Sequence, residues 1–393
     1  MAISYAYIEW DRPDREYLPA RETAVNFDFS EDQDMLRNEA RKFLEGRCPI
    51  DKPRAVMDDA KRGYDAGLWQ ELVEQGWTAL TIPEEHGGLG MTRTDLCVLA
   101  EELGRVLAPV PFASTIYLLA EALMIAGNDA QMAKLAAIAT GECIGCLAVW
   151  EGPGEPAFDQ VETQVSAGLL SGTKQPVVDG IAATDALVWA KDESGTARLF
   201  LVPLDHQSIT RESVETLDSS REAAIITFNG TPAEPIGEPD LLERLLDGAA
   251  VLLAFEQVGG ADRALEQALD FAKERHAFGR AIGSYQAIKH KLADAYVNNQ
   301  IARSNAYYGI WALDADSTEL PQAAAAARVG ACAAFWYAAK ESIQTHGGIG
   351  FTWEADQHLF YRRALFLDMA IGSPRLWRDR LFRSVELHSA EAG

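Results

Sequence analysis

The stretch Gln344-Thr345-His346-Gly347-Gly348-Ile349-Gly350-Phe351 lies near the C-terminus and follows an alanine-rich segment. It has an upstream counterpart in Arg275-His276-Ala277-Phe278-Gly279. In isolation, the pair Gly347-Gly348 is best explained as an ordinary helix stop. Beside a cation, however, glycines also suit a diphosphate, because they let backbone N–H groups approach the phosphate oxygens closely. The two stretches together favour phosphate binding, with Arg275 as the cation and the amide of Gln344 next to it.

Length and composition indicate a globular chain. Its 393 residues suggest two or three packed units, and 48% hydrophobic with 24% charged residues is ordinary. The net charge of −24 would repel both nucleic acid and anionic membranes. No apolar run reaches the roughly 18 residues needed to span a bilayer, and Met1 to Ala24 lack the apolar core of a signal peptide. We therefore expect a cytoplasmic protein, with no nucleic-acid partner and no membrane insertion.

The cysteines and histidines give no metal pattern. Five scattered cysteines are too few for a disulfide framework, which favours a reducing compartment. Cys143 and Cys146 form a C-x-x-C pair, but no second pair or nearby histidine completes a four-ligand zinc site. The seven histidines do not fall at ligand spacing either. We interpret Cys143 and Cys146 as buried apolar thiols and predict no metal.

The periodicity of the chain changes twice. Ser30 and Gln33 predict a capping box that opens a helix. The apolar face predicted for this helix consists of Met35, Leu36, Ala40, Phe43 and Leu44. Further helices are expected at 68–75, 94–107, 116–126 and 130–139.

Between about residues 144 and 228 the hydrophobic period falls toward two and turn residues accumulate, which predicts a small, mostly antiparallel β-domain. Long helices return at 241–275, 285–313 and 322–345. The fold class is therefore α+β. We predict an N-terminal extension at 1–27, a helical domain at 28–143, a β-domain at 144–236 and a helical bundle at 237–393.

Four motifs, taken in order, resemble the acyl-CoA dehydrogenase family from about residue 28 to the end. They are Pro83 to Gly90 with the helix start and Glu101-Glu102-Leu103-Gly104 behind it, Arg275 to Gly279, Tyr285 to Lys289, and Gln344 to Gly350. Chance matches to four ordered motifs multiply to a small value. The resemblance implies an N-terminal helical domain, a middle antiparallel β-domain and a C-terminal four-helix bundle. It also implies α,β-dehydrogenation of an acyl-CoA thioester with FAD, and an electron-transfer flavoprotein as electron acceptor.

The resemblance further implies that FAD lies across a subunit interface. The ADP end is touched by the neighbouring subunit, and the isoalloxazine ring is held by the β-domain of its own subunit. The residues of this sequence that match the ADP-end motifs are Arg275, Phe278, Gln286, Gln344, Gly347, Gly348 and Gly350.

The ring-end motifs are altered. The loop that in the family resembles Thr-Glu-Pro-x-x-Gly-Ser-Asp reads Trp150-Glu151-Gly152-Pro153-Gly154-Glu155-Pro156 here, without the Ser-Asp ending. The strand that resembles Lys-x-Trp-Ile-Thr-Asn-Gly carries Pro176 and Val178 at its tryptophan and threonine positions. Each lost donor beside the flavin removes about 1–3 kcal/mol when the site is desolvated. We expect the ring to bind here less tightly or in a changed pose.

The catalytic base is altered as well. Proton abstraction next to a thioester requires a carboxylate, and the two glutamate positions used across the family correspond here to Ile371 and Ala249. Substitute bases to consider are Glu256, Glu101, Glu102, Asp95 and, three residues from Ile371, Asp368. For Glu256 a capped or interface-paired carboxylate is the favoured alternative, and for Asp95 a helix cap.

Kept ADP-end motifs with altered ring and base positions resemble one subunit of a heteromeric acyl-CoA dehydrogenase, such as the α2β2 enzymes of bacterial steroid degradation. The leading hypothesis is that Arg275 and Gln344 hold the ADP end of a flavin whose ring and base belong to a homologous partner. A second hypothesis is a self-sufficient homotetramer with a displaced base, for which Glu256 is the candidate. A third is a non-enzymatic helical scaffold. The acyl group stays open between a steroid-derived and a fatty acyl-CoA.

Overall fold

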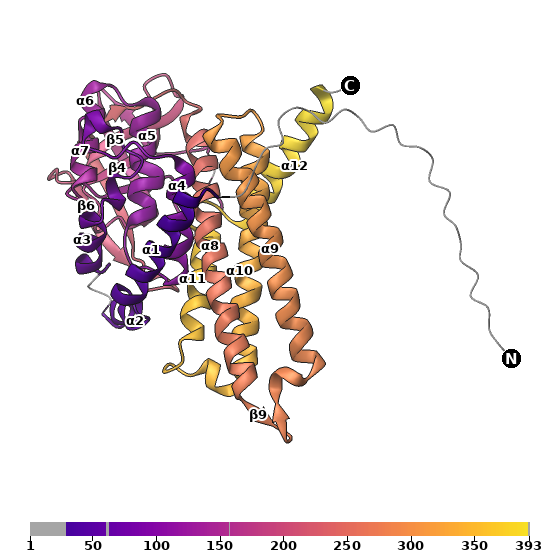
Figure 1. Cartoon of the computed structure of the whole chain (residues 1–393). Coiled ribbons are helices and arrows are strands. Elements are labelled where there is room, and N and C mark those ends of the chain that lie inside the picture. Colours follow the sequence, from indigo (N-terminus) through magenta and orange to yellow (C-terminus); the bar gives the residue numbers. More distant parts are fainter. Residues whose placement is uncertain (1–28, 60–62, 157, 392–393) are drawn as a thin grey trace, which may run out of the picture.

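The computed structural model describes residues 29–59, 63–156 and 158–391 (Figure 1). The predicted extension at 1–27, with the segment Met1 to Ala24, lies outside these residues. In the described part of the chain a helical unit comes first, a β-sheet follows, and long helices form the remainder. Within the same residues no helix is both long and apolar enough to cross a membrane. The predicted order of elements is confirmed, while the domain boundaries stay a prediction.

The N-terminal unit begins at the predicted capping box, in which Ser30 accepts a hydrogen bond from the Gln33 amide. Ala40 and Leu44 are buried as predicted, but Met35 is 60% exposed, so its place on the buried face was wrong. Met35 lies one residue from Leu36, about 100° around the helix from the buried stripe. The helices of this unit are α1 (Glu31–Arg47), α2 (Asp51–Asp58), α3 (Ala66–Glu74), α4 (Arg93–Arg105), the π-helical η3 (Ala113–Ala120), α5 (Glu121–Ala126), α6 (Asp129–Met132) and α7 (Lys134–Ala139).

The middle unit is one eight-stranded sheet, with strand order β6-β7-β3-β2-β4-β5-β8 and β1 paired to β4. Its pairings are antiparallel, as predicted, except that β4 pairs in parallel with β1 and β2. The strands are β1 (Gly145–Ala148), β2 (Gln164–Ser166), β3 (Leu169–Val178), β4 (Asp185–Lys191), β5 (Ala197–Pro203), β6 (Ile209–Val214), β7 (Ala223–Pro232) and β8 (Glu234–Pro235). β1 and β4 are buried nearly throughout, which places the core of the sheet beside the helices.

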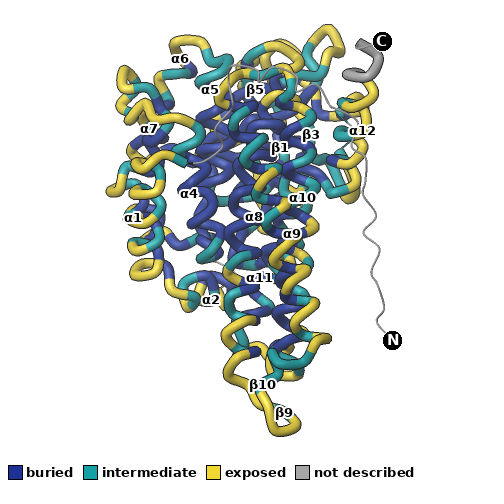
Figure 2. Tube along the Cα trace, turned by 45° about the vertical axis from the view of Figure 1, so that its right-hand side comes forward, coloured by how far each residue is buried: buried dark blue, intermediate teal, exposed yellow. Residues whose placement is uncertain are grey.

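The C-terminal unit is a bundle of long helices. They are α8 (Leu241–Glu274), α9 (Gln286–Asp314), α10 (Leu320–His346), α11 (Gln357–Met369) and α12 (Pro374–Glu391). The alanines of α10 are almost all buried, because small side chains let neighbouring helices approach closely. Figure 2 shows the buried centre of the molecule around α4 and α8, and an exposed end of the bundle at β9 and β10.

Two glycines bring α4 against α8. A Cβ on Gly104 would lie 2.0 Å from the Glu256 carbonyl oxygen, and one on Gly259 would lie 1.9 Å from that of Glu101. The helix backbones therefore touch at this crossing, where no larger residue fits. This contact joins the N-terminal unit to the bundle.

Candidate functional site

The Arg275 to Gly279 motif forms a hairpin at the exposed end of the bundle. β9 (His276–Ala277) pairs with β10 (Arg280–Ala281) across a two-residue turn. In that turn Phe278 has φ +53° and Gly279 has φ +80°, the positive angles that such tight turns require. Phe278 is a bulky residue in this conformation and its side chain is 96% exposed. A bulky residue therefore stands at an angle that usually favours glycine or asparagine, with its ring exposed.

The hairpin is rigidly held, and two of the predicted residues project from its base. The Tyr285 hydroxyl donates to the Ala277 carbonyl at 3.0 Å, and the Arg280 guanidinium lies 3.9 Å from the centre of the Tyr285 ring. Arg275 ends α8 and Gln286 begins α9, and both are exposed. Charged and amide donors are thus presented to solvent from a fixed frame.

The Gln344 to Gly350 motif ends α10 at the same end of the bundle (Figure 1). Gly347 is the residue after the helix and has φ +64°, which confirms the helix-stop interpretation. A Cβ on Gly347 or Gly348 would meet nothing within 4 Å, so both backbones face open space. Gly350 is different, since a Cβ there would lie 2.7 Å from the Ile343 carbonyl oxygen.

An aromatic stack links the two motifs. The Phe271 ring, one turn before Arg275 on α8, stacks on the His346 ring at the end of α10 with 4.2 Å between centroids. The His346 Nδ1 atom is 2.8 Å from the Ser342 carbonyl oxygen, which orients the ring. Segments about 70 residues apart are therefore held together as one unit.

Gln344 and Gly350 also line a cavity of about 590 Å³, which we call the outer cavity. Its charged lining includes Lys291, Lys340 and Arg362 against one carboxylate. That carboxylate, Glu341, forms ion pairs with Lys291 at 2.8 Å and with Lys340 at 3.2 Å. A net positive cavity is notable on a chain of net charge −24. The open backbones of Gly347 and Gly348 do not line this cavity, but they lie in the chain between its lining residues Gln344 and Gly350. Cations and open glycine backbone are the donors that a diphosphate needs, so this end of the bundle fits the ADP end of FAD chemically.

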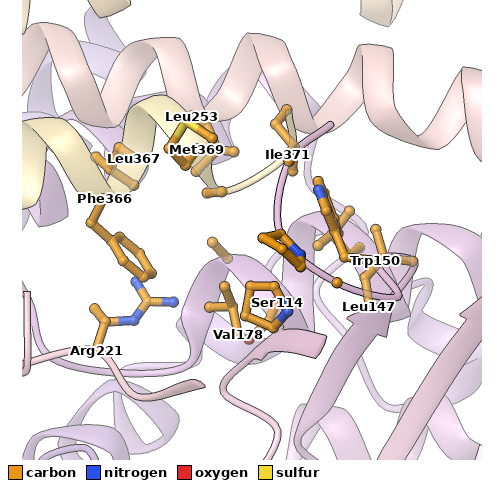
Figure 3. Close-up of a pocket in the computed structure, with 17 residues that line it drawn as sticks. Ser114, Leu147, Trp150, Val178, Arg221, Leu253, Phe366, Leu367, Met369 and Ile371 are labelled. Atoms are coloured by element: carbon orange, nitrogen blue, oxygen red, sulfur yellow. The ribbon is translucent and has the colours of Figure 1, made fainter. Parts of the chain in front are cut away.

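A second cavity, the inner cavity, lies between the sheet, the η3 helix, α8 and the end of α11 (Figure 3). Its volume is about 220 Å³. The structure brings four of the altered family positions together in its wall: Trp150, Pro176, Val178 and Ile371. Their shared location was not deducible from the sequence without the family resemblance.

The polar lining of the inner cavity was missed by the sequence analysis. It consists of Ser114 and Arg221. The Arg221 guanidinium donates to both Asp179 carboxylate oxygens, at 3.2 and 2.7 Å, and the Ser114 hydroxyl donates to Asp179 at 2.5 Å. All three residues are buried. Asp179 belongs to the altered ring-end strand and has φ +57°, but nothing in the sequence singled out Arg221.

The candidate bases do not reach the inner cavity. Glu256 is 5% exposed on α8 and is absent from the cavity lining in the described part of the chain. Burial raises the pKa of the Glu256 carboxyl, and the positive charges of Arg221 and Arg363 oppose this effect. Ala249 is fully buried about two turns before Glu256 on the same face of α8.

The remaining carboxylates have structural partners. Glu101 pairs with Arg303 at 2.9 Å, and Glu102 accepts two hydrogen bonds from Arg41 at 2.9 and 2.6 Å. Asp95 is the third residue of the capping box of α4, as the helix-cap interpretation predicted. Asp368 accepts from the Gln257 amide at 3.2 Å.

The inner cavity therefore does not fit a flavin ring with a catalytic base. Among the described residues that line it, none carries a carboxylate. Its volume of about 220 Å³ falls below the roughly 300–1,000 Å³ of typical small-molecule pockets.

Cys143 and Cys146 are buried, as predicted.

Comparisons with known proteins identify the family. A model of the acyl-CoA dehydrogenase N-terminal domain matches residues 30–142, and one of the C-terminal domain matches residues 240–385. Acyl-CoA dehydrogenase IpdE2 of Mycobacterium tuberculosis is 34% identical over 346 residues, which cover 88% of this chain and 94% of that protein.

Among solved structures, the Tcur3481-Tcur3483 steroid ACAD has 30% identity and a TM-score of 0.84, covering 92% of this chain and 99% of that one. A chain of the ChsE4-ChsE5 complex from Mycobacterium tuberculosis has 24% identity and a TM-score of 0.84 over the same shares, 92% and 99%, which shows the common fold. Sequence, fold and motif geometry agree that this chain belongs to the acyl-CoA dehydrogenase family of oxidoreductases.

Proposed function

We propose that this chain is one subunit of a heteromeric acyl-CoA dehydrogenase. It holds the ADP end of an FAD whose ring and catalytic base belong to a homologous partner subunit. One observation carries the proposal: the ADP-end residues Arg275, Phe278 and Gln344 are exposed at the bundle end, while the cavity of the chain itself is small and lined by Pro176 and Ile371.

The comparisons support a paired assembly. The solved relative at 30% identity carries the paired name Tcur3481-Tcur3483 and is called a steroid ACAD. The ChsE4-ChsE5 structure is likewise named as a complex of two differently named proteins. We propose by analogy that the substrate is a steroid-derived acyl-CoA, which undergoes α,β-dehydrogenation.

The residues of this chain have binding roles in the proposed enzyme. FAD, when bound, accepts the hydride from the acyl group. Arg275 neutralises the diphosphate, and Gln344 and Gln286 offer amide donors to the same end of the cofactor. The backbone at Gly347 and Gly348 admits close approach, because no Cβ stands in the way. Phe278 covers the cofactor from the strained turn of the hairpin.

Flavin stoichiometry tests the proposal. The chain is prepared alone and together with a homologous partner encoded beside it, and FAD per polypeptide is measured by absorbance after gel filtration. We expect little FAD on the lone chain and about one FAD per two chains in the mixed complex. About one FAD per chain in the lone protein would contradict the proposal and favour the self-sufficient enzyme, with Glu256 as its candidate base and an electron-transfer flavoprotein as its partner. A mixed complex without flavin would favour a scaffold.

The Arg275→Gln variant tests the assigned contact. Loss of a charge-assisted hydrogen bond costs about 1.5–3 kcal/mol, so we expect the mixed complex to bind FAD about 10- to 100-fold more weakly. Arg263→Gln is the matched control, because Arg263 is also an exposed arginine of α8 but pairs with Glu266 at 3.2 Å. Equal FAD affinity in the two variants would remove Arg275 from the site.

A further inference from the structure

Two walls of the inner cavity are tied together across its edge. One wall is the loop after β1, of which Gly152, Pro153 and Gly154 line the cavity. The other is the segment after α11, of which Ala370 and Ile371 line it. Glu155 directly follows the first wall and Ser373 closely follows the second, and their side chains meet.

The contact is a double hydrogen bond. The Ser373 hydroxyl donates to one carboxylate oxygen of Glu155, and the Ser373 backbone N–H donates to the other at 3.4 Å. Among the described residues no lysine or arginine forms an ion pair with Glu155. Ser373 is therefore the residue that supplies the hydrogen-bond donors to this carboxylate.

Both ends of this contact are anchored. On the loop side, Glu151 accepts from the buried Lys174 ammonium at 2.7 Å and from the Thr163 amide at 2.9 Å. Burial lowers the pKa of Lys174 to about 8, opposed by Glu151. The loop thus has a fixed point four residues before Glu155.

On the helix side, Ser373 also caps α12, since its hydroxyl oxygen accepts from the backbone N–H groups of Arg375 at 3.2 Å and Leu376 at 3.4 Å. The indole of the fully buried Trp377 donates to the Ile371 carbonyl at 3.2 Å. The segment from Ile371 to Ser373 is therefore held from α12 and cannot drift away from Glu155.

We infer that the Glu155–Ser373 pair is a clasp that shuts the inner cavity and keeps this subunit from taking a flavin of its own. The inference rests on the proposed function and adds the residues that prevent FAD from binding in the inner cavity of this subunit. A ring entering the cavity must part the two walls, and an FAD diphosphate must then pass a carboxylate that no lysine or arginine of the described residues neutralises. Trp150 in the cavity wall adds a steric barrier.

Two variants separate the clasp from the steric barrier. Trp150→Thr clears the cavity and keeps the clasp, whereas Trp150→Thr/Glu155→Ala also removes the clasp. Each is prepared in the mixed complex, saturated with FAD and passed over gel filtration, and FAD per polypeptide is measured by absorbance. We expect Trp150→Thr to remain at about one FAD per two chains and the double variant to rise toward one per chain, a twofold increase.

The outcomes separate the two proposals. If both variants stay at one FAD per two chains, while their elution volumes and unfolding midpoints match the parent complex, the clasp is refuted and the proposed function stands. If Trp150→Thr alone reaches one per chain, the clasp is refuted too. If the parent complex already carries one FAD per chain, the proposed function itself fails. Glu85→Gln, in an exposed loop of the N-terminal unit, is the control for removing a surface carboxylate and should leave the count unchanged.

Discussion

Ile371 places an aliphatic side chain in the inner cavity at the position where the family resemblance implies a glutamate. Its side chain is 2% exposed, and its carbonyl is fixed by the Trp377 indole at 3.2 Å. The only charged group in the described lining, Arg221, is already satisfied by Asp179. The position is thus as precisely held as a catalytic one would be, yet its surroundings suit an apolar group.

An Ile371→Glu variant should show the cost of a carboxylate in this cavity. Burial without a partner raises a carboxyl pKa, so the folded state is most stable below the unfolded value of about 4.3 and loses stability as pH rises through the raised folded pKa. We expect Ile371→Glu to fall about 2–4 kcal/mol below the neutral, equally sized Ile371→Gln at pH 8, and to approach it near pH 5. Urea unfolding of both variants at the two pH values measures this. Parallel pH profiles would mean that Arg221 or water neutralises the charge.

At the scale of elements, the crossing of α4 and α8 has no room for side chains larger than hydrogen at its two glycines. The helix backbones meet at Gly104 and Gly259, where a Cβ would lie about 2 Å from a carbonyl oxygen of the other helix. At the same crossing, Glu101 forms an ion pair with Arg303, and Glu102 forms one with Arg41. The crossing therefore combines a steric limit with buried charge pairs, and it sets the distance between the N-terminal unit and the bundle.

Gly259→Ala should destabilise the protein strongly, because the new methyl group meets the Glu101 carbonyl oxygen at 1.9 Å and backbone must move. We expect a loss of about 3 kcal/mol or more in unfolding free energy. Gly46→Ala is the matched control, since Gly46 lies in α1 and a Cβ there meets nothing within 4 Å. It should instead stabilise by about 0.5–1 kcal/mol through helix propensity. Denaturant unfolding of the lone chain distinguishes them, and similar values for both would show that the crossing can open.

A second inter-element contact is sensitive to pH. Asp247 on α8 accepts from Arg380 on α12 at 2.6 Å, and its side chain is 3% exposed. Burial raises the pKa of Asp247 from 3.8 to about 6, against the opposing effect of Arg380.

Because the folded pKa of Asp247 is raised, the protonated folded state is favoured. The contribution of Asp247 to the free energy of unfolding is therefore greatest below about pH 4, and it is lost as the pH rises through about 6. Relative to Asp247→Asn, the parent chain should lose about 3 kcal/mol of unfolding free energy across this window. The measurement is the free energy of unfolding of both proteins at pH 4 and pH 7.5. Subtracting one protein from the other at each pH removes the effect of pH on all other groups of the chain. A constant difference would show that the ion pair fully offsets the burial.

At the scale of the molecule, the ADP-end motifs and the inner cavity belong to different regions. The inner cavity is lined by the sheet, η3, α8 and the end of α11, whereas β9 and β10, which flank Phe278, lie at the exposed end of the bundle (Figure 2). Phe278 is 96% exposed and Phe351 is 77% exposed. Large exposed aromatic side chains on a rigid frame are typical of interface anchors.

Phe278→Asn should weaken assembly with the partner subunit and leave the fold intact. Asparagine tolerates the positive φ of this turn, so the hairpin is kept. Loss of an aromatic anchor costs about 2 kcal/mol, or about 30-fold in partner affinity. Sedimentation measures the affinity, and thermal unfolding of the lone chain should be unchanged. Met35→Asn removes a 60% exposed apolar side chain on α1 and is the control. Equal affinity of both variants would place the interface elsewhere.

Much of the fold could be predicted from short-range pattern. The capping box at Ser30, the long helices and the strand-rich middle were all predicted within a few residues, whereas the diphosphate role of the two glycine motifs stays a prediction. Helix periodicity, caps and turn glycines depend on neighbours a few residues apart, so a linear sequence carries them. Met35 fails this test, because the edge of an apolar stripe depends on what packs against it.

Contacts between distant residues could not be predicted in the same way. The Glu155–Ser373 pair joins positions 218 residues apart, and Arg221 reaches Asp179 across 42 residues. Neither pair has a local signature, since nothing near a carboxylate, a serine or an arginine in the sequence says which distant residue the fold brings to it. Likewise, only packing shows that Glu256 is enclosed beside α4 and stays out of the inner cavity.

The amino-acid order of this protein was enough to predict its family and its succession of helices and strands, and the comparisons and the structure confirm both. Those properties reside in short motifs whose chemistry does not depend on distant neighbours. Tertiary packing decided two further features. It left the Arg275 and Gln344 motifs exposed at the end of the bundle. It also made the inner cavity small, where the sheet meets α8, α11 and the start of α12 and where Glu155 contacts Ser373. Burial and side-chain pairing are set by close packing of the whole chain, and a one-dimensional pattern contains no measure of either.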